Sequence, residues 1–148
     1  MTTEQKRQTL FIGVDVHKDT HTAVGVSPFG EKLFEITVGN YSKDFRSLAE
    51  TVESVSSKET LSPYFGLEDC SGFGERLSGF LLDSGYIVVH VPPILVDERR
   101  KNETHPEKSD SLDAFGVAKV MLQRSDTLLP YTVTEESRKA KADQGDIG

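Results

Sequence analysis

Two apolar segments of strand length each carry an acidic residue at the C-terminal end: residues 10–16 with Asp15, and residues 62–68 with Glu68. Both segments are typical of buried strands. Because the side chains of a strand alternate between its two faces, Gly13 lies on the face of Asp15, and Gly66 lies on the face of Glu68. The glycines leave space beside each carboxylate, where a bulky group could fit. The sequence therefore predicts two neighbouring acids with room around them.

A predicted helix further along the chain carries two more acids, Asp110 and Asp113, three residues apart. Both lie on one helical stripe with the apolar residues Ala114, Val117 and Met121. This stripe would aim two carboxylates at the surface on which the helix packs, and an unpaired buried charge is costly. Divalent cations would offset that cost, because they bind carboxylate oxygens. The four acids together indicate a metal site suited to chemistry on phosphodiesters.

Each acid also has a structural interpretation when it is considered alone. Ser109 or Asp110 could be an ordinary helix N-cap, and Asp113 a first-turn acid favoured by the helix dipole. Asp15 and Glu68 could be strand-end residues that lead into loops. Two strand-end acids combined with two acids at a helix start favour a shared site over four separate structural roles.

Length and composition predict one soluble domain without a membrane span. The chain has 148 residues, 36% of them apolar, which is enough for a real core. Its apolar stretches are strand-sized, and no signal-peptide pattern follows the start, so we expect a cytoplasmic protein. Cys70 is the only cysteine, so no internal disulfide can form, and no Cys/His cluster has zinc-ligand spacing. Cys70 is interpreted as a small core residue, with a reactive thiol as the alternative.

The formal net charge of −7 argues against a domain that binds nucleic acid by positive charge alone. Bound cations would nevertheless reverse the potential around the acids. Basic residues that are candidates for phosphate or DNA contacts, or else for a solvated surface, are Lys18, Arg99, Arg100 and Lys108. His17 follows Asp15 closely and has the same two interpretations, whereas His21, His90 and His105 fit no catalytic pattern and are expected to be ordinary strand or loop residues.

The order of the predicted elements is β-β-β-α-β-α-β-α. Apolar patterns predict strands at residues 10–16, 22–26, 32–38, 62–68 and 86–91. Helical spacing predicts helices after residue 42, after the glycine-rich turn 69–74, and from about 108 to about 124, with a charged loop at 99–107. The second helix is expected to bury Phe73, Leu77, Phe80 and Leu81, and to stop at Gly85.

This order predicts an α/β fold of the ribonuclease H-like three-layer type, with a mixed five-stranded sheet and helices on both faces. The first strand and the strand that leads to Glu68 would be neighbours at the sheet centre, with the last helix laid across them. Residues 8–125 would form this domain. Residues 126–148 are polar and would begin a linker.

Three segments resemble motifs of the DEDD-type transposases of the insertion-sequence one-ten family, whose N-terminal domain is RuvC-like. They are residues 12–18, 66–74 and 108–114. The resemblance implies that Asp15, Glu68, Asp110 and Asp113 bind Mg²⁺ or Mn²⁺, as two ions, for DNA strand cleavage and exchange during insertion-sequence transposition. It also implies DNA as partner, a guide RNA as a further partner known in the family, and self-association. In the family a nucleophilic serine lies in a C-terminal domain that this chain does not include.

Two other functions are compatible with parts of the pattern. The chain could be a folded DNA-binding or dimerisation module that is catalytically silent. It could also be one lobe of an actin-like sugar kinase, since such folds begin with a strand, an aspartate and a hairpin. His17-Lys-Asp-Thr20 lacks the glycine and threonine pattern of a phosphate-binding hairpin, and one domain of this size cannot close over a nucleotide.

Overall fold

The computed structural model describes residues 1–93, 95–96 and 109–132. Its strands are β1 (Thr9–Val16), β2 (Thr20–Val26), β3 (Lys32–Gly39), β4 (Ser62–Leu67) and β5 (Ile87–His90). Its helices are α1 (Thr3–Arg7), α2 (Ser42–Glu59), α3 (Glu75–Asp83) and α5 (Asp110–Gln123). The predicted order is confirmed, with the short α1 as an addition. The charged loop predicted at 99–107 and most of the predicted linker lie outside the described residues.

The five strands form one mixed sheet in the order β3-β2-β1-β4-β5. β1 pairs antiparallel with β2, and β2 with β3, which is the predicted meander. β1 pairs parallel with β4, and β4 with β5. The strand of Asp15 and the strand that leads to Glu68 are therefore central neighbours, as predicted, and their C-terminal ends lie at one edge of the sheet.

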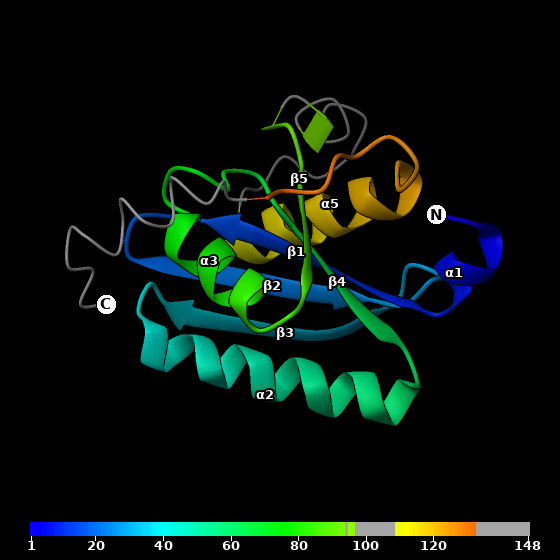
Figure 1. Cartoon of the computed structure of the whole chain (residues 1–148), viewed down its shortest axis with the longest axis horizontal. Helices are drawn as coiled ribbons and strands as arrows, with labels where there is room; N and C mark the ends of the chain where they lie inside the picture. Colours follow the sequence, from blue (N-terminus) through cyan, green and yellow to red (C-terminus); the bar gives the residue numbers. More distant parts are fainter. Residues whose placement is uncertain (94, 97–108, 133–148) are drawn as a thin grey trace.

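Helices cover both faces of the sheet, with α2 and α3 on one side and α5 on the other (Figure 1). Leu10, Ile12 and Val14 of β1 belong to the core under α2 and α3, whereas Phe11 belongs to the core under α5. Because faces alternate along the strand, Asp15 lies on the α5 side. The three-layer arrangement is thus the predicted one.

The space that Gly13 and Gly66 leave on the α5 side is filled by α5 itself. A Cβ atom at Gly13 would overlap the backbone of Ala114 and Ala118, and a Cβ atom at Gly66 would overlap the side chain of Met121. Gly13 therefore lets the helix backbone rest directly on β1. This close approach fixes the position of the helix start relative to the end of the strand.

The turn between β4 and α3 differs from the prediction. Phe73, expected in the core, is 53% exposed, while Leu77 and Leu81 are fully buried. The reason is that α3 begins only at Glu75, so Phe73 lies in the preceding turn and not on the inward helical stripe. Gly85 has φ +89°, which agrees with its predicted role as the stop signal.

The chain after α5 runs back along β5. Pro130 forms an antiparallel bridge with Val89. The backbone N–H of Tyr131 donates to the carbonyl of Val88 at 2.7 Å, and the N–H of His90 donates to the carbonyl of Leu129 at 3.3 Å. The boundary at residue 125 remains a prediction. None of the described helices is long and apolar enough to cross a bilayer.

Candidate metal centre

Asp15 and Glu68 lie at the ends of adjacent parallel strands. Val14 pairs with Leu67 in the register of β1 and β4, and the two acids are the next residue in each chain. Asp15 is 6% exposed, although it carries a carboxylate. Glu68 is half-buried and comes directly after β4. Topology thus brings both acids to one edge of the sheet.

Helix α5 begins with a capped turn. The Ser109 side chain accepts a hydrogen bond from the backbone N–H of Leu112 at 3.1 Å, so Ser109 is the N-cap, and both acids lie in the first turn. The Ser111 hydroxyl donates to Glu35 of β3 at 2.5 Å. This hydrogen bond, together with the contact at Gly13, anchors the helix start that carries Asp110 and Asp113.

The two acids of α5 differ in burial. Asp113 is 7% exposed, as predicted for a residue on the core-facing stripe. The prediction that Asp110 also faces inward is wrong, because its side chain is 56% exposed. As the first residue of α5, it has no preceding helical turn to cover it.

His17 lies between two of the carboxylates. Its Nε2 is 2.8 Å from Oδ2 of Asp15 and 3.2 Å from Oδ1 of Asp110. Among the described residues, these three form the one group of metal-ligating side chains whose ligand atoms all lie within 4.8 Å of one another, so the group excludes Glu68 and Asp113. The sequence predicts His17 as a phosphate contact or as a solvated surface residue, and neither prediction includes this contact with two carboxylates. The two-residue spacing from Asp15, which puts both side chains on one strand face, was the available signal.

The charge of a third carboxylate, Asp113, also acts on this group. Burial raises the pKa of Asp15, the hydrogen bond and charge of His17 oppose that rise, and the negative charges of Asp113 and Asp110 add to it. The hydrogen bond that His17 donates to the Asp15 carboxylate raises the pKa of His17, burial opposes this, and the charges of Asp15 and Asp110 add to the rise. Asp15, Asp110 and Asp113 therefore share one negative field.

The acid next to Glu68 has a structural task. Oδ1 of Asp69 accepts from the N–H of Gly72 at 2.8 Å, and Oδ2 accepts from the N–H of Phe73 at 3.0 Å. Both carboxylate oxygens thereby stabilise the glycine-rich turn. Of the two adjacent acids, Glu68 remains the candidate for the metal centre.

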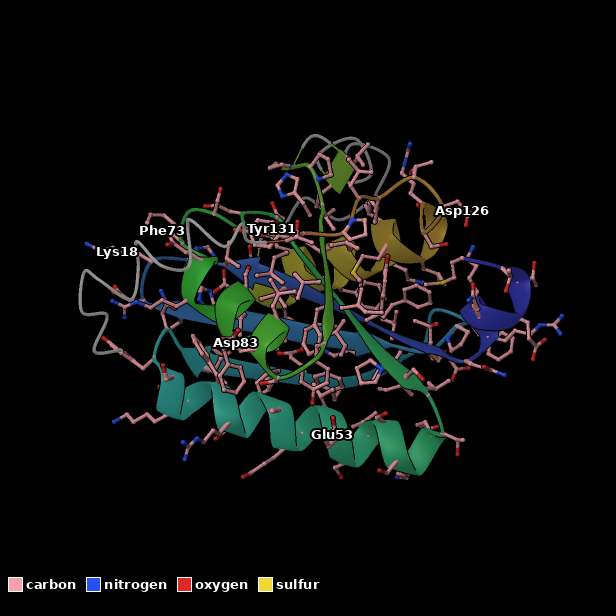
Figure 2. The ribbon with its side chains drawn as sticks, in the orientation of Figure 1. Lys18, Glu53, Phe73, Asp83, Asp126 and Tyr131 are labelled. Atoms are coloured by element: carbon pink, nitrogen blue, oxygen red, sulfur yellow. The ribbon has the colours of Figure 1, made fainter. Side chains whose placement is uncertain are left out.

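Of the four basic candidates, only Lys18 lies within the described residues. It is exposed in the turn between β1 and β2, and Figure 2 shows it at the same end of the molecule as Phe73, opposite Asp126. Arg99, Arg100 and Lys108 lie outside the described residues.

The donor set fits hard divalent cations. Carboxylate oxygens suit Mg²⁺ and Mn²⁺, and an imidazole nitrogen is more acceptable to Mn²⁺ than to Mg²⁺. The buried Asp15, whose charged form is disfavoured by burial and by two neighbouring acids, is the kind of carboxylate that a cation would stabilise. Within the part of the chain that the structure describes, the ligand atoms of Asp15, His17 and Asp110 are close enough to share a metal ion. The charge of Asp113 acts on Asp15, and Glu68 directly follows the neighbouring strand.

Comparisons with known proteins agree on one family and one fold. Residues 12–146 match a family model described as transposase. The structure is similar to Thermus thermophilus RuvC solved in complex with a Holliday junction substrate, with TM-score 0.57 and 13% identity, over 83% of this chain and 99% of that chain. It is also similar to a second T. thermophilus RuvC structure, with TM-score 0.54 and 14% identity, over 83% and 100%. None of the curated proteins compared with the sequence matches it.

Proposed function

Because the chain belongs to the DEDD-type transposases of the insertion-sequence one-ten family, whose model matches residues 12–146, we propose that Asp15, Glu68, Asp110 and Asp113 form its catalytic metal centre. The centre acts in DNA strand cleavage and exchange during insertion-sequence transposition. The membership and the RuvC-like fold confirm the resemblance noted in the three motifs. The protein is an enzyme of DNA recombination, and the sugar-kinase alternative is set aside.

One observation carries the proposal: acids from the two ends of the described fold converge. Oxygens of Asp15 and Asp110 lie within 4.8 Å of each other and of one nitrogen of His17, although the acids are far apart in sequence. The charge of Asp113 also acts on Asp15. His17 compensates only part of the cost of the buried Asp15 charge beside two further acids, so a bound cation would stabilise this arrangement.

The four acids would hold Mg²⁺ or Mn²⁺, as two ions. Bound ions would neutralise the scissile phosphate and stabilise charge on the attacking and leaving oxygens. The chain's own residues hold the ions and present the edge of the sheet to DNA, with Lys18 as a positive contact for phosphate. The nucleophile would be a water molecule beside this centre or the serine of the family's C-terminal domain.

Several partners follow from the same proposal. DNA is the substrate, which accords with the Holliday junction named for one structural neighbour. A guide RNA, self-association and a cytoplasmic location are carried over from the family and from the sequence, and each stays a prediction.

Metal binding and DNA cleavage test the proposal separately. We expect Mn²⁺ titration by calorimetry to give saturable binding for the wild-type chain and a large loss for Asp15→Asn and Asp113→Asn. Glu50→Gln is the control, because it removes a carboxylate from the exposed surface of α2, on the other side of the sheet. Equal Mn²⁺ binding by the wild-type chain and by Asp15→Asn would contradict the proposed centre.

The cleavage assay uses branched and linear DNA in Mg²⁺ or Mn²⁺. If this chain cuts alone, Asp15→Asn abolishes cutting and Glu50→Gln does not. Metal binding that requires the acids, without any cutting, would identify the chain as the metal-binding domain of an enzyme that needs its serine-bearing domain.

A further inference from the structure

His21 is a fully buried histidine at the end of the sheet that carries the acids. It pairs with Val16 in the register of β1 and β2, so its side chain lies on the α2 side, opposite to that of Asp15. Its ring stacks against Phe45 of α2, with centroids 6.2 Å apart and planes 29° apart. The expectation of an ordinary strand residue does not account for its polar contacts.

Two contacts define the proton position on the His21 ring. The backbone N–H of His17 can only donate; it donates to the carbonyl of Thr20 at 3.0 Å and also lies 3.4 Å from Nδ1 of His21. Nδ1 is therefore the acceptor, and the proton of the neutral ring is on Nε2. Nε2 then donates to Oδ1 of Asn40 at 2.9 Å.

This donor defines the orientation of the Asn40 amide. With Oδ1 facing His21, Nδ2 of Asn40 donates to the carbonyl of Lys18 at 3.0 Å and to the carbonyl of Phe73 at 3.4 Å. Both partners are carbonyls, which can only accept. Each hydrogen bond in the series that runs from His17 through His21 and Asn40 therefore has one donor and one acceptor. The amide of Asn40 therefore joins the turn between β1 and β2 to the glycine-rich turn after Glu68.

Backbone contacts tie the same residue to its surroundings. The N–H of Asn40 donates to the carbonyl of Asp19 at 2.9 Å, and the guanidinium of Arg76 in α3 donates to the carbonyl of Asn40 at 3.4 Å. Asn40 thus contacts three parts of the chain that are distant in sequence. All of them border the edge where Asp15 and Glu68 lie.

We infer that His21 and Asn40 are positioning residues that hold the turn after Asp15 and the turn after Glu68 at a fixed separation. This inference rests on the proposed metal centre, and it assigns to both residues a task on the sheet face opposite to the carboxylates. Strand pairing fixes β1 against β4 only up to Val14 and Leu67. Asp15 and Glu68 are the first residues beyond that pair. The hydrogen bonds of Asn40 connect the two turns that follow them.

The test uses two variants and a neighbouring control. Asn40→Ala removes the bridge from a half-buried position, and His21→Phe keeps a ring against Phe45 but removes both polar contacts. Tyr41→Ala is the control, since Tyr41 is exposed and its side chain makes no capping hydrogen bond. We expect both variants to weaken Mn²⁺ binding by about tenfold or more in calorimetry, as for other residues that orient metal ligands, with the control unchanged.

A second measurement separates this inference from the proposed function. Hydrogen exchange of the metal-free chain should show faster exchange at His17 and at Gly72 to Gly74 in Asn40→Ala, with the amides of α2 unchanged. If the wild-type chain binds no Mn²⁺, the proposed centre fails, and the exchange result alone decides whether Asn40 joins the two turns. Wild-type exchange in both turns, or wild-type Mn²⁺ affinity in Asn40→Ala, overturns the inference.

Discussion

Asp15 carries its charge at a cost in the metal-free protein. Its pKa is raised chiefly by burial, with contributions from Asp113 and Asp110, and His17 compensates only in part. A carboxyl group whose folded pKa exceeds its value of 3.8 in the unfolded chain binds protons more readily when folded. The folded state is therefore favoured below the unfolded pKa and loses that advantage as pH rises through the folded pKa.

Asp15→Asn should consequently stabilise the metal-free chain at pH 7. In a domain of this size each kcal/mol relieved raises the melting temperature by about 2–4 °C. Thermal unfolding in EDTA checks the increase, which should shrink at pH 4. With Mn²⁺ added, the wild-type chain should gain stability and Asp15→Asn should not. A lower melting temperature for the variant in EDTA would show that Asp15 stabilises the fold itself.

His21 predicts a second pH effect of defined sign. Burial lowers its pKa from 6.5, the hydrogen bond with Asn40 opposes this, and the charge of His17 adds to it. Because the unfolded chain takes up the proton first, His21 lowers stability as pH falls below about 6.5. His17 acts oppositely, since its raised pKa adds stability that is present below 6.5 and lost as pH rises through the folded value.

Comparing two chains isolates the His21 contribution. The melting temperature of the wild-type chain should fall more steeply between pH 6.5 and pH 5 than that of His21→Phe, which keeps His17. Circular dichroism melts at several pH values measure both slopes. Parallel curves would exclude a buried neutral His21.

At the residue scale, the sequence supplied the acids but not their contacts. Asp15 and Asp113 could be predicted as inward-facing from strand and helix periodicity alone. The two-residue spacing could place His17 beside Asp15, but the contact of His17 with Asp110 and that of His21 with Asn40 could not be predicted, because these partners are distant in sequence. The structural role of Asp69, next to Glu68, follows only from the hydrogen bonds that its carboxylate accepts from two backbone N–H groups.

At the scale of elements, α5 and β1 work as one unit. Apolar periodicity predicts the order of strands and helices. It does not predict how closely α5 packs on β1, because the space beside Gly13, which the sequence predicts as open, is filled by the backbone of α5. The short α1, with its capping box of Thr2 and Gln5, was missed because five residues carry too little apolar pattern. The prediction for Phe73 is wrong because its spacing from Leu77 fits a helical stripe, whereas α3 begins at Glu75, two residues after Phe73.

Gly13→Ala tests the coupling between α5 and the acids. The new methyl group would overlap the backbone of α5, which cannot move as a side-chain end can, so we expect destabilisation of about 1–3 kcal/mol or more. Displacing the helix also moves Asp110 and Asp113, so Mn²⁺ affinity should fall. Urea unfolding and calorimetry measure the two effects.

Gly79→Ala is the matched control, because nothing lies within 4 Å of a Cβ atom at that position of α3. It should be neutral or stabilising by about 0.5–1 kcal/mol. If Gly13→Ala behaved like this control, α5 would not rest on β1.

At the scale of the whole molecule, an acidic chain must bind a polyanion. The net charge of −7 disfavours DNA binding, and the acids of the proposed centre contribute to that charge. DNA affinity should therefore depend on the metal, which would neutralise the edge where the phosphate is proposed to bind. Fluorescence anisotropy with labelled branched DNA should show tighter binding in Ca²⁺ or Mn²⁺ than in EDTA. Asp15→Asn should lose that difference and Glu50→Gln should retain it, whereas equal wild-type affinity in EDTA would place DNA binding elsewhere.

The bridge between Val89 and Pro130 has a consequence for how this protein can be shortened. β5 is an outer strand of the sheet, and residues 129–131 occupy part of its free hydrogen-bonding side. A chain cut after Arg124, near the boundary that the sequence suggests, would leave that side open for intermolecular strand addition. Light scattering should therefore detect aggregates of a chain that ends at Arg124 and a dispersed species for one that ends at Thr132. The shortest chain that remains dispersed should therefore include residues 129–131, which cover the outer strand β5.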